Sequence, residues 1–292
     1  MRVLLVGAGG LLGTAVRHTV PQGVDLVSLT KQDVDITDRQ AVAATVERIR
    51  PEYLINCSGY TAVDQAEREL DLAHRVNAEG ATHLAAATER ARGTLVQLST
   101  DYVFDGKRDV PYREDDEPGP LSVYGRTKLA GEQAVRDLLP DRHLIVRSQW
   151  LFGAGGKNFV DTILRLASEQ STLRAVNDQR GRPTYAGDLA AGIWKLVRRG
   201  IRGTVHVAND GAATWFDVAA VALAAAALRT RLEPCRTADM PRPAQRPAFS
   251  VLDCSRFEAL TGERLPPWDA AVREYATSRS STFRVASTND GG

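Results

Sequence analysis

A glycine-rich turn near the start of the chain constrains the fold more than any other feature of the sequence. Residues 7–13 read Gly-Ala-Gly-Gly-Leu-Leu-Gly. The preceding apolar residues 3–6 are typical of a strand, and residues 11–19 carry apolar side chains at helical spacing. Glycines in such a turn allow a ligand to approach closely, and the N–H groups of the helix N-terminus favour an anion. We therefore predict that Gly7, Gly10 and Gly13 shape a site for the pyrophosphate of a dinucleotide.

Strand and helix patterns go on alternating to about residue 150. Crossover helices between short β-branched strands are typical of a doubly wound parallel sheet, which binds ligands at the carboxyl ends of its strands. We therefore predict the α/β class with a Rossmann-type sheet. Further strands are expected at residues 24–29, 53–56, 94–98 and 143–147, and further helices at residues 39–49, 72–90 and 125–138.

The alternation weakens after Trp150, which indicates a second, smaller unit. We predict a dinucleotide-binding domain over residues 1–152, to which some later segments return, and a mostly substrate-binding C-terminal lobe over residues 153–275. The proline-rich residues 234–247 are expected to form an ordered loop, because proline lacks an N–H donor. Residues 278–292 have few apolar anchors and are expected to form a disordered tail.

The composition excludes several classes of partner. The 37 Lys and Arg residues nearly balance 36 Asp and Glu residues, so neither nucleic acid nor an anionic membrane is expected as the main partner. No apolar run approaches the roughly 20 residues that span a bilayer, and the N-terminal apolar run is too short for a signal peptide. Cys57, Cys235 and Cys254 lack disulfide or metal-ligand spacing, which favours reduced thiols and a cytoplasmic protein.

The end of the second predicted strand indicates the choice of dinucleotide. NAD-selective sites place an acidic residue there, whereas this chain has Thr30 and Lys31. Thr30 can hydrogen-bond a 2′-phosphate and Lys31 can offset its charge, so we predict NADPH, with NADH as a weaker substitute. The alternative for Lys31 is a solvated turn residue. Asp35 and Ile36 are expected near the adenine.

Tyr124 and Lys128 form the most specific pattern in the chain. Four residues apart, they share one face of a predicted helix. A neighbouring ammonium favours the phenolate, so Lys128 is expected to lower the pKa of the Tyr124 phenol and to hold the nicotinamide ribose. Thr100, at the end of the fourth predicted strand, is expected to direct its hydroxyl at the same carbonyl oxygen. The alternative is a surface Tyr and Lys on an amphipathic helix.

Several blocks of sequence together resemble the dTDP-4-dehydrorhamnose reductase family, which belongs to the extended short-chain dehydrogenases/reductases. The resemblance extends to about Trp268 and implies reduction of the C4 ketone of dTDP-4-dehydro-L-rhamnose to dTDP-L-rhamnose. The blocks are Gly7-x-x-Gly10-x-x-Gly13, residues 56–67 (NCSGYTAVDQAE), 99–106 (STDYVFDG), 124–132 (YGRTKLAGE), 147–150 (RSQW), 177–184 (NDQRGRPT) and 246–250 (RPAFS).

The resemblance and the residue patterns together give the predicted site. We expect Tyr124, Lys128 and Thr100 to be catalytic. For Trp150 the alternative is a core aromatic residue, and for Arg246, a candidate for the substrate diphosphate, it is a surface ion pair. The expected cofactor contacts are Gly7, Gly10, Leu11, Leu12, Gly13, Thr30, Lys31, Asp35, Ile36, Ser58, Gly59, Tyr60, Thr61, Tyr124 and Lys128, and the expected substrate contacts are Thr61, Val63, Thr100, Asp101, Tyr102, Trp150 and Arg246.

Two positions depart from patterns in the family. Some members dimerise through a magnesium site built from glutamates, but here the first helix reads Thr14-Ala15-Val16 and Gly187 follows the later block. Because Mg²⁺ prefers oxygen ligands, we predict no bound metal and a monomer or a dimer without a metal bridge. Thr30 replaces the acid of NADH-using relatives.

Three other functions are compatible with a fold of this kind. Nucleotide-sugar dehydratases carry a Thr-Asp-Glu triplet, whereas this chain has Tyr102 in place of the Glu, so reduction is favoured over dehydration. A 4-ketoreductase for another dTDP-linked 4-keto-deoxysugar stays open, because fold and catalytic residues do not determine the sugar. A non-catalytic, NADP-binding regulatory subunit is less favoured, since binding alone does not need Thr100, Tyr124 and Lys128.

Overall fold

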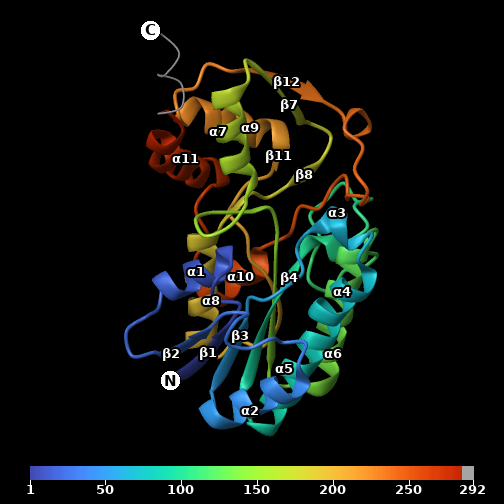
Figure 1. Cartoon of the computed structure of the whole chain (residues 1–292), viewed down its shortest axis with the longest axis vertical. Coiled ribbons are helices and arrows are strands. Elements are labelled where there is room, and N and C mark those ends of the chain that lie inside the picture. Colours follow the sequence, from blue (N-terminus) through green and yellow to red (C-terminus); the bar gives the residue numbers. More distant parts are fainter. Residues whose placement is uncertain (285–292) are drawn as a thin grey trace.

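The computed structural model describes residues 1–284, and its centre is a six-stranded parallel sheet with the strand order β10-β5-β4-β3-β1-β2 (Figure 1). The order reverses direction after β1, so the sheet is doubly wound, as predicted. The strands are β1 (Arg2–Val6), β2 (Asp25–Leu29), β3 (Tyr53–Asn56), β4 (Thr94–Thr100), β5 (His143–Ser148) and β10 (Gly203–His206).

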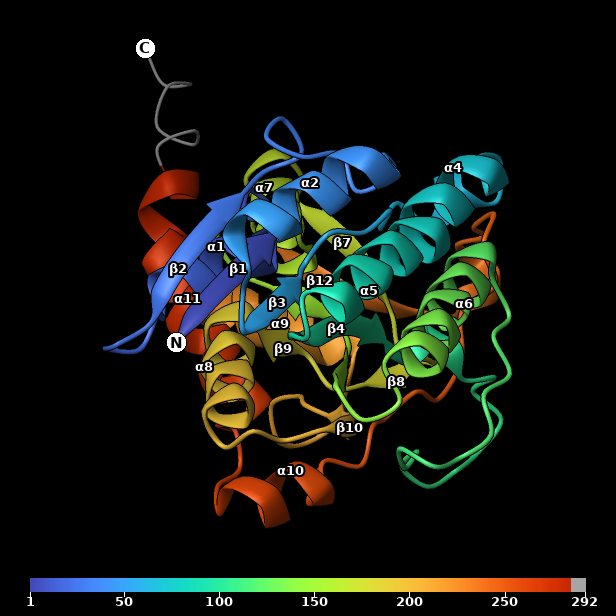
Figure 2. The same cartoon turned by 90° about the horizontal axis from the view of Figure 1, so that it is seen from below.

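Helices cover both faces of the sheet (Figure 2). Val16 and Trp194 belong to a buried apolar cluster on one face, and Leu84 and Val135 belong to a second cluster on the other. Strands buried on both faces need such apolar cover. The first face carries α1 (Leu11–His18), α8 (Ala186–Arg198) and α10 (Ser255–Thr261), and the second carries α2 (Arg39–Ile49), α5 (Gly80–Arg90) and α6 (Val123–Leu138).

The helix predicted over residues 72–90 is interrupted by a π-helical turn. It consists of α4 (Leu70–His74), the π-helix η1 (Arg75–Glu79) and α5. Close packing at the junction requires Gly80, because a Cβ there would lie 2.7 Å from Cδ1 of Ile36. Single π-turns are frequent at functional sites. This one contains Asn77, whose side chain reaches the loop after β3.

Segments from the second half of the chain return to the sheet. β10 extends it beyond β5, and α8 packs against α1, where Trp194 Nε1 donates a hydrogen bond of 3.1 Å to the Val16 carbonyl. α7 (Phe159–Glu169), α9 (Trp215–Ala225) and α11 (Trp268–Arg284) pack together as a separate lobe beyond the carboxyl ends of the strands (Figure 1). Three pairs of short strands complete the lobe. They are β6 (Leu151–Phe152) with β9 (Thr184–Tyr185), β8 (Arg180–Gly181) with β11 (Ala213–Thr214), and β7 (Thr172–Val176) with β12 (Arg231–Cys235).

Two local predictions need correction. Pro234 lies in β12 and a short 3-10 turn, η3 (Thr237–Asp239), follows, so only the rest of the proline-rich segment is a loop. The tail predicted to be disordered from residue 278 is helical to Arg284, because α11 packs against α7 and α9. Residues 285–292 of that prediction lie outside the described part of the chain. Within residues 1–284, no helix is long and apolar enough to cross a membrane.

Candidate active site

The glycine turn forms an open cradle at the N-terminus of α1. Gly7 has φ +77°, and a Cβ there would lie 2.5 Å from the Ser58 nitrogen. A Cβ on Gly13 would lie 2.2 Å from the Gly7 carbonyl oxygen, so the fold itself requires both glycines. Gly10 is the N-cap of α1, and the nearest protein atom to a Cβ there would be 3.5 Å away. The helix N-terminus therefore stays accessible to a pyrophosphate.

A cavity of about 470 Å³ runs from this turn along the ends of β1, β2 and β3. Six predicted cofactor contacts do not line it: Leu11, Leu12, Gly13, Thr61, Tyr124 and Lys128. Leu12 is buried in the core beside the sheet. The predicted cofactor residues that line it are Gly7, Gly10, Thr30, Lys31, Asp35, Ile36, Ser58, Gly59 and Tyr60.

The end of β2 is less cationic than the sequence predicted. The Thr30 backbone N–H and hydroxyl both donate to Asp33 Oδ2, each at 2.8 Å. These bonds hold the pKa of the Asp33 carboxyl below its usual value. Lys31 Nζ lies 3.9 Å from Asp35 Oδ2 and its side chain is 77% exposed. A 2′-phosphate must therefore displace Asp33 from the Thr30 hydroxyl.

Two asparagines that the sequence analysis missed hold the loop after β3. Asn56 Oδ1 accepts from the Ser58 N–H at 2.9 Å. Asn77 Oδ1 accepts from the Tyr60 N–H at 2.9 Å, and Asn77 Nδ2 donates to Thr127 Oγ1 on α6 at 3.1 Å. Asn77 thus ties the cofactor loop to the helix of Tyr124. Only the tertiary contact distinguishes Asn77 from other polar residues of its helix.

Lys128 lies buried between α6 and β4. Its Nζ donates to the Leu98 carbonyl at 2.6 Å, and the residue is 7% exposed. Burial lowers the pKa of Lys128 to about 8, and the interactions with Glu132 and Cys57 oppose this shift. A Cβ on Gly59 would lie 4.0 Å from the same Nζ. The ammonium therefore faces the loop that lines the cofactor cavity.

The predicted effect of Lys128 on Tyr124 is wrong in this structure. Burial raises the pKa of the Tyr124 phenol to about 12; the charge of Asp101 adds to the rise and a hydrogen bond with Thr100 opposes it. Lys128 is not among the groups that shift this pKa, and its ammonium donates to the Leu98 carbonyl. Burial therefore sets the acidity of Tyr124, and Thr100 and Asp101 modify it in opposite directions.

Thr100 and Asp101 are joined beneath the Tyr124 phenol. Thr100 Oγ1 donates to Asp101 Oδ1 at 3.0 Å and accepts from the Tyr102 N–H at 3.2 Å. Ser250 Oγ donates to Asp101 Oδ2 at 2.6 Å. Asp101 is 1% exposed, and burial raises its pKa to about 6. Asp101 was predicted to contact substrate, but both its oxygens are already bonded within the protein.

Tyr102 connects this cluster to Arg246. The Tyr102 and Tyr124 rings meet edge to face, with centroids 5.4 Å apart, and Tyr102 also bonds Arg246. Arg246 forms a bidentate ion pair with Asp64, both N–O distances being 2.9 Å, and is 19% exposed. Arg246 is thus ion-paired in this structure, and its contact with the substrate diphosphate stays a prediction. Thr61 is exposed just before α3 (Val63–Ala66), which Val63 begins.

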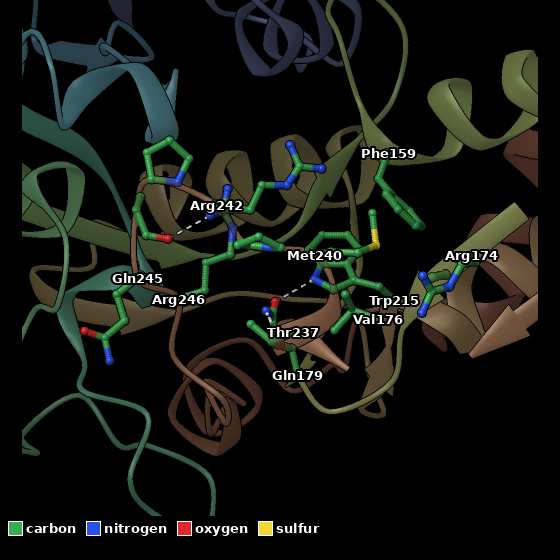
Figure 3. A pocket seen from close by; sticks show the side chains of 14 residues that line it. Phe159, Arg174, Val176, Gln179, Trp215, Thr237, Met240, Arg242, Gln245 and Arg246 are labelled. Atoms are coloured by element: carbon green, nitrogen blue, oxygen red, sulfur yellow. Dashed lines mark hydrogen bonds between the residues drawn. The ribbon is translucent and has the colours of Figure 1, made fainter. Parts of the chain in front are cut away.

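Arg246 also lines a second cavity, of about 600 Å³, in the C-terminal lobe (Figure 3). Phe159 and Trp215 give it an aromatic wall, and Arg174 and Arg242 add cationic groups. Trp215 Nε1 donates to Gln179 Oε1 at 3.1 Å, and Gln179 Nε2 donates to Thr237 Oγ1 at 2.9 Å. Among these residues, only Arg246 was a predicted site residue, and Gln179 lies in the block 177–184 that resembles the family.

Trp150 reaches this cavity only through Trp215. The two indoles stack with centroids 3.6 Å apart and planes 7° apart, and Trp150 has φ +49°. Trp150 packs against the lobe core and is absent from the cavity wall. Trp150 thus packs as an aromatic residue of the lobe core, and its contact with the substrate stays a prediction.

Four features of the site lie near the carboxyl ends of β1, β3 and β4. They are the glycine cradle, the buried Lys128, the phenol of Tyr124 and the hydroxyl of Thr100. These groups can bind a dinucleotide and give a proton to a carbonyl oxygen. Among residues 1–284, no group of three or more His, Cys, Asp or Glu side chains could hold a metal ion. Fold and site together define a short-chain dehydrogenase/reductase.

Comparison with known proteins specifies the family. The model of the RmlD substrate binding domain matches residues 1–280, and the chain belongs to this family. It is 43% identical over 280 residues to a dTDP-4-dehydrorhamnose reductase of Streptomyces griseus (94% of this chain, 92% of the relative). It is 39% identical over 294 residues to a dTDP-4-keto-6-deoxy-D-glucose reductase of Streptomyces niveus (99% of each). The crystal structure of a dTDP-4-dehydrorhamnose reductase of Bacillus anthracis in complex with NADP has a TM-score of 0.91 and 37% identity (94% of this chain, 98% of that one).

Proposed function

We propose that this protein reduces the C4 ketone of dTDP-4-dehydro-L-rhamnose to dTDP-L-rhamnose with NADPH. The observation that carries the proposal is the hydrogen bond between Tyr124 and Thr100 at the end of β4. Tyr124 contacts Tyr102, which bonds Arg246 of the lobe cavity. Family membership supplies the substrate: the relative from S. griseus is named for this reaction.

The chain's own residues bind the two reactants and move one proton. The N–H groups at Gly10 would hold the pyrophosphate, and Lys128 would hold the nicotinamide ribose. NADPH supplies the hydride when bound. Tyr124 gives its proton to the carbonyl oxygen, and the Thr100 hydroxyl stabilises the phenolate that results.

The lobe cavity suits the nucleoside diphosphate. The rings of Phe159 and Trp215 offer apolar faces to a pyrimidine base, and Arg174 and Arg242 offer cations to the diphosphate. Arg246 lies between this cavity and Tyr102, so it would meet the phosphate nearest the sugar by loosening its pair with Asp64.

The proposed preference for NADPH rests on Thr30, since no acid ends β2. The B. anthracis relative is a complex with NADP. Asp33 weakens the preference for NADPH, because its carboxylate accepts the hydrogen bond of the Thr30 hydroxyl that the 2′-phosphate would accept. NADH is expected to serve less well.

A second candidate is reduction of another dTDP-linked 4-keto-deoxysugar. The S. niveus relative, named a dTDP-4-keto-6-deoxy-D-glucose reductase, spans the chain with similar identity. Both reactions need the same proton donor and cofactor, so product stereochemistry separates them. A cytoplasmic location and a monomer or homodimer remain our predictions.

The test is NADPH oxidation with dTDP-4-dehydro-L-rhamnose generated from dTDP-4-dehydro-6-deoxy-D-glucose by a 3,5-epimerase, followed by NMR identification of the sugar. Tyr124→Phe removes the proton donor and is expected to lower kcat by about 10²–10⁴-fold. Tyr185→Phe, in the lobe, is the matched control and should keep its activity. A wild-type rate no higher than that of Tyr124→Phe would overturn the enzymatic function, and a product other than dTDP-L-rhamnose would favour the second candidate.

A further inference from the structure

The hydroxyl of Thr100 cannot donate a hydrogen bond to all of its neighbours at once. It has one proton to donate, yet it lies within hydrogen-bonding reach of the Asp101 carboxylate and of the Tyr124 phenol. One of its lone pairs already accepts from the Tyr102 N–H. The direction of this single proton therefore depends on whether Asp101 is an acceptor only or can itself donate.

Asp101 is a buried carboxyl group without a cationic partner in the described part of the chain. Its contacts are the hydroxyls of Thr100 and Ser250 and the backbone N–H groups of residues 101 and 102. The titratable groups that face it are the phenols of Tyr102 and Tyr124. Arg246 and Asp64 act on Tyr102. A buried carboxyl with neutral neighbours favours the protonated form.

We propose that Asp101 is a positioning residue: its protonated form turns the Thr100 hydroxyl toward Tyr124, and its ionised form turns that hydroxyl away. When Asp101 is ionised, its carboxylate accepts the hydrogen bond from the Thr100 hydroxyl. Tyr124 can then only donate to Thr100 Oγ1, so the phenol proton points at Thr100 and not at the ketone. When protonated, Asp101 donates from Oδ1 to Thr100 Oγ1 while Ser250 still donates to Oδ2. Thr100 then donates to the Tyr124 oxygen and leaves the phenol proton for the ketone.

The expected signature is a rate of hydride transfer that falls as the pH rises, because burial places the pKa of Asp101 at about 6. This part of the inference rests on the proposed reduction. At about pH 8, roughly 1% of Asp101 would be protonated, so the rate should be about 100-fold below its plateau. Single-turnover oxidation of NADPH by the keto sugar measures this rate without product release.

Asp101→Asn is the decisive variant. Its amide can donate to Thr100 and accept from Ser250 at every pH, so the fall between about pH 6 and about pH 8 should disappear. At about pH 8 the variant should be 10-fold or more faster than the wild type. A folded Asp101→Asn protein that keeps the wild-type pH dependence, or is slower at every pH, would overturn the proposal.

Ser250→Ala gives a second, milder test. It removes one hydrogen bond to the carboxylate, so the fall in rate should move upward by about one pH unit. An unchanged or lower midpoint contradicts the role of Asp101.

A readout without turnover separates this inference from the proposed function. The ¹³C NMR signal of the Tyr124 Cζ should shift with a midpoint near 6 in the wild type, and this shift should be absent in Thr100→Val and in Asp101→Asn. A Tyr124 signal that does not change as Asp101 ionises would refute the proposed role of Asp101, even if reduction of the keto sugar is observed. If the Tyr124 signal responds but no keto sugar is reduced, the proposed role of Asp101 holds and the proposed function fails.

Discussion

The buried ammonium of Lys128 links chemistry to stability at the scale of a single residue. Burial lowers the pKa of Lys128 from its ordinary value of 10.5 to about 8. The unfolded chain therefore binds a proton at this site over a pH range in which the folded chain does not. Charged Lys128 reduces the free energy of unfolding at neutral pH, and this penalty disappears as the pH rises from about 8 toward the unfolded value.

Lys128→Met is accordingly expected to stabilise the protein while it impairs catalysis. The shift corresponds to about 3 kcal/mol, and the lost hydrogen bond to the Leu98 carbonyl offsets part of it, leaving a gain of about 2 kcal/mol at pH 7. Gln97 Nε2 still donates to that carbonyl at 3.0 Å. Urea denaturation at about pH 7 and about pH 10 measures the effect, and a gain that fails to shrink at the higher pH argues against this cause.

At the scale of an element, α6 carries a stripe of functional side chains one turn apart. Tyr124, Lys128 and Glu132 share one face, and Glu132 is fully buried. The Glu132 carboxylate holds Arg147 of β5 through bonds of 2.9 and 2.7 Å and also contacts Arg136. These hydrogen bonds keep the pKa of Glu132 below its usual value despite burial. The ion pair thus joins the catalytic helix to the sheet.

Glu132→Leu is expected to leave the charge of Arg147, which is 1% exposed, without its partner. Removing one member of a buried pair costs about 3–5 kcal/mol, whereas replacing both with apolar groups costs much less. The double variant Glu132→Leu/Arg147→Met should therefore recover most of the loss. A double-mutant cycle from urea denaturation checks this; equal losses in the single and double variants would mean that the pair is not the cause.

At the scale of the whole molecule, the sheet and the lobe each supply one cavity. The sheet cavity lies at the ends of β1, β2 and β3, and the lobe cavity lies between α7, α9 and the loop after η3. The bidentate pair between Arg246 and Asp64 joins the lobe-side loop to α3. The two reactants should consequently bind to separable sets of residues.

A pair of matched variants tests this division. Trp215→Ala should raise KM for the sugar nucleotide about 10-fold or more, because an aromatic face for the base is lost, and should leave Kd for NADPH unchanged. Thr30→Asp should weaken NADPH binding by a similar factor and leave the sugar nucleotide unaffected. Fluorescence titration gives Kd for NADPH, and steady-state kinetics gives KM. Equal effects of both variants on both ligands would contradict separate sites.

Local patterns in the sequence predicted the main elements and the centre of the site. The glycine turn, the strands and the spacing of Tyr124 and Lys128 depend on residues near one another in the chain, and the structure contains all of them. The same locality explains the misses. The π-helical turn at Asn77 ends just before Gly80, where a Cβ would lie 2.7 Å from Cδ1 of Ile36, and no pattern within the helix indicates that contact.

The sequence by itself determined that a doubly wound sheet would carry a glycine cradle and a Tyr-Lys helix, because periodicity and turn chemistry act over a few residues. Only the tertiary structure decided what surrounds them. It brought Ser250 to Asp101, 149 residues away, and Arg246 to Asp64, 182 residues away. Burial then set the acidity of Tyr124, Lys128 and Asp101. Desolvation and the partners of a buried group depend on every segment packed around it, and one stretch of sequence does not contain them.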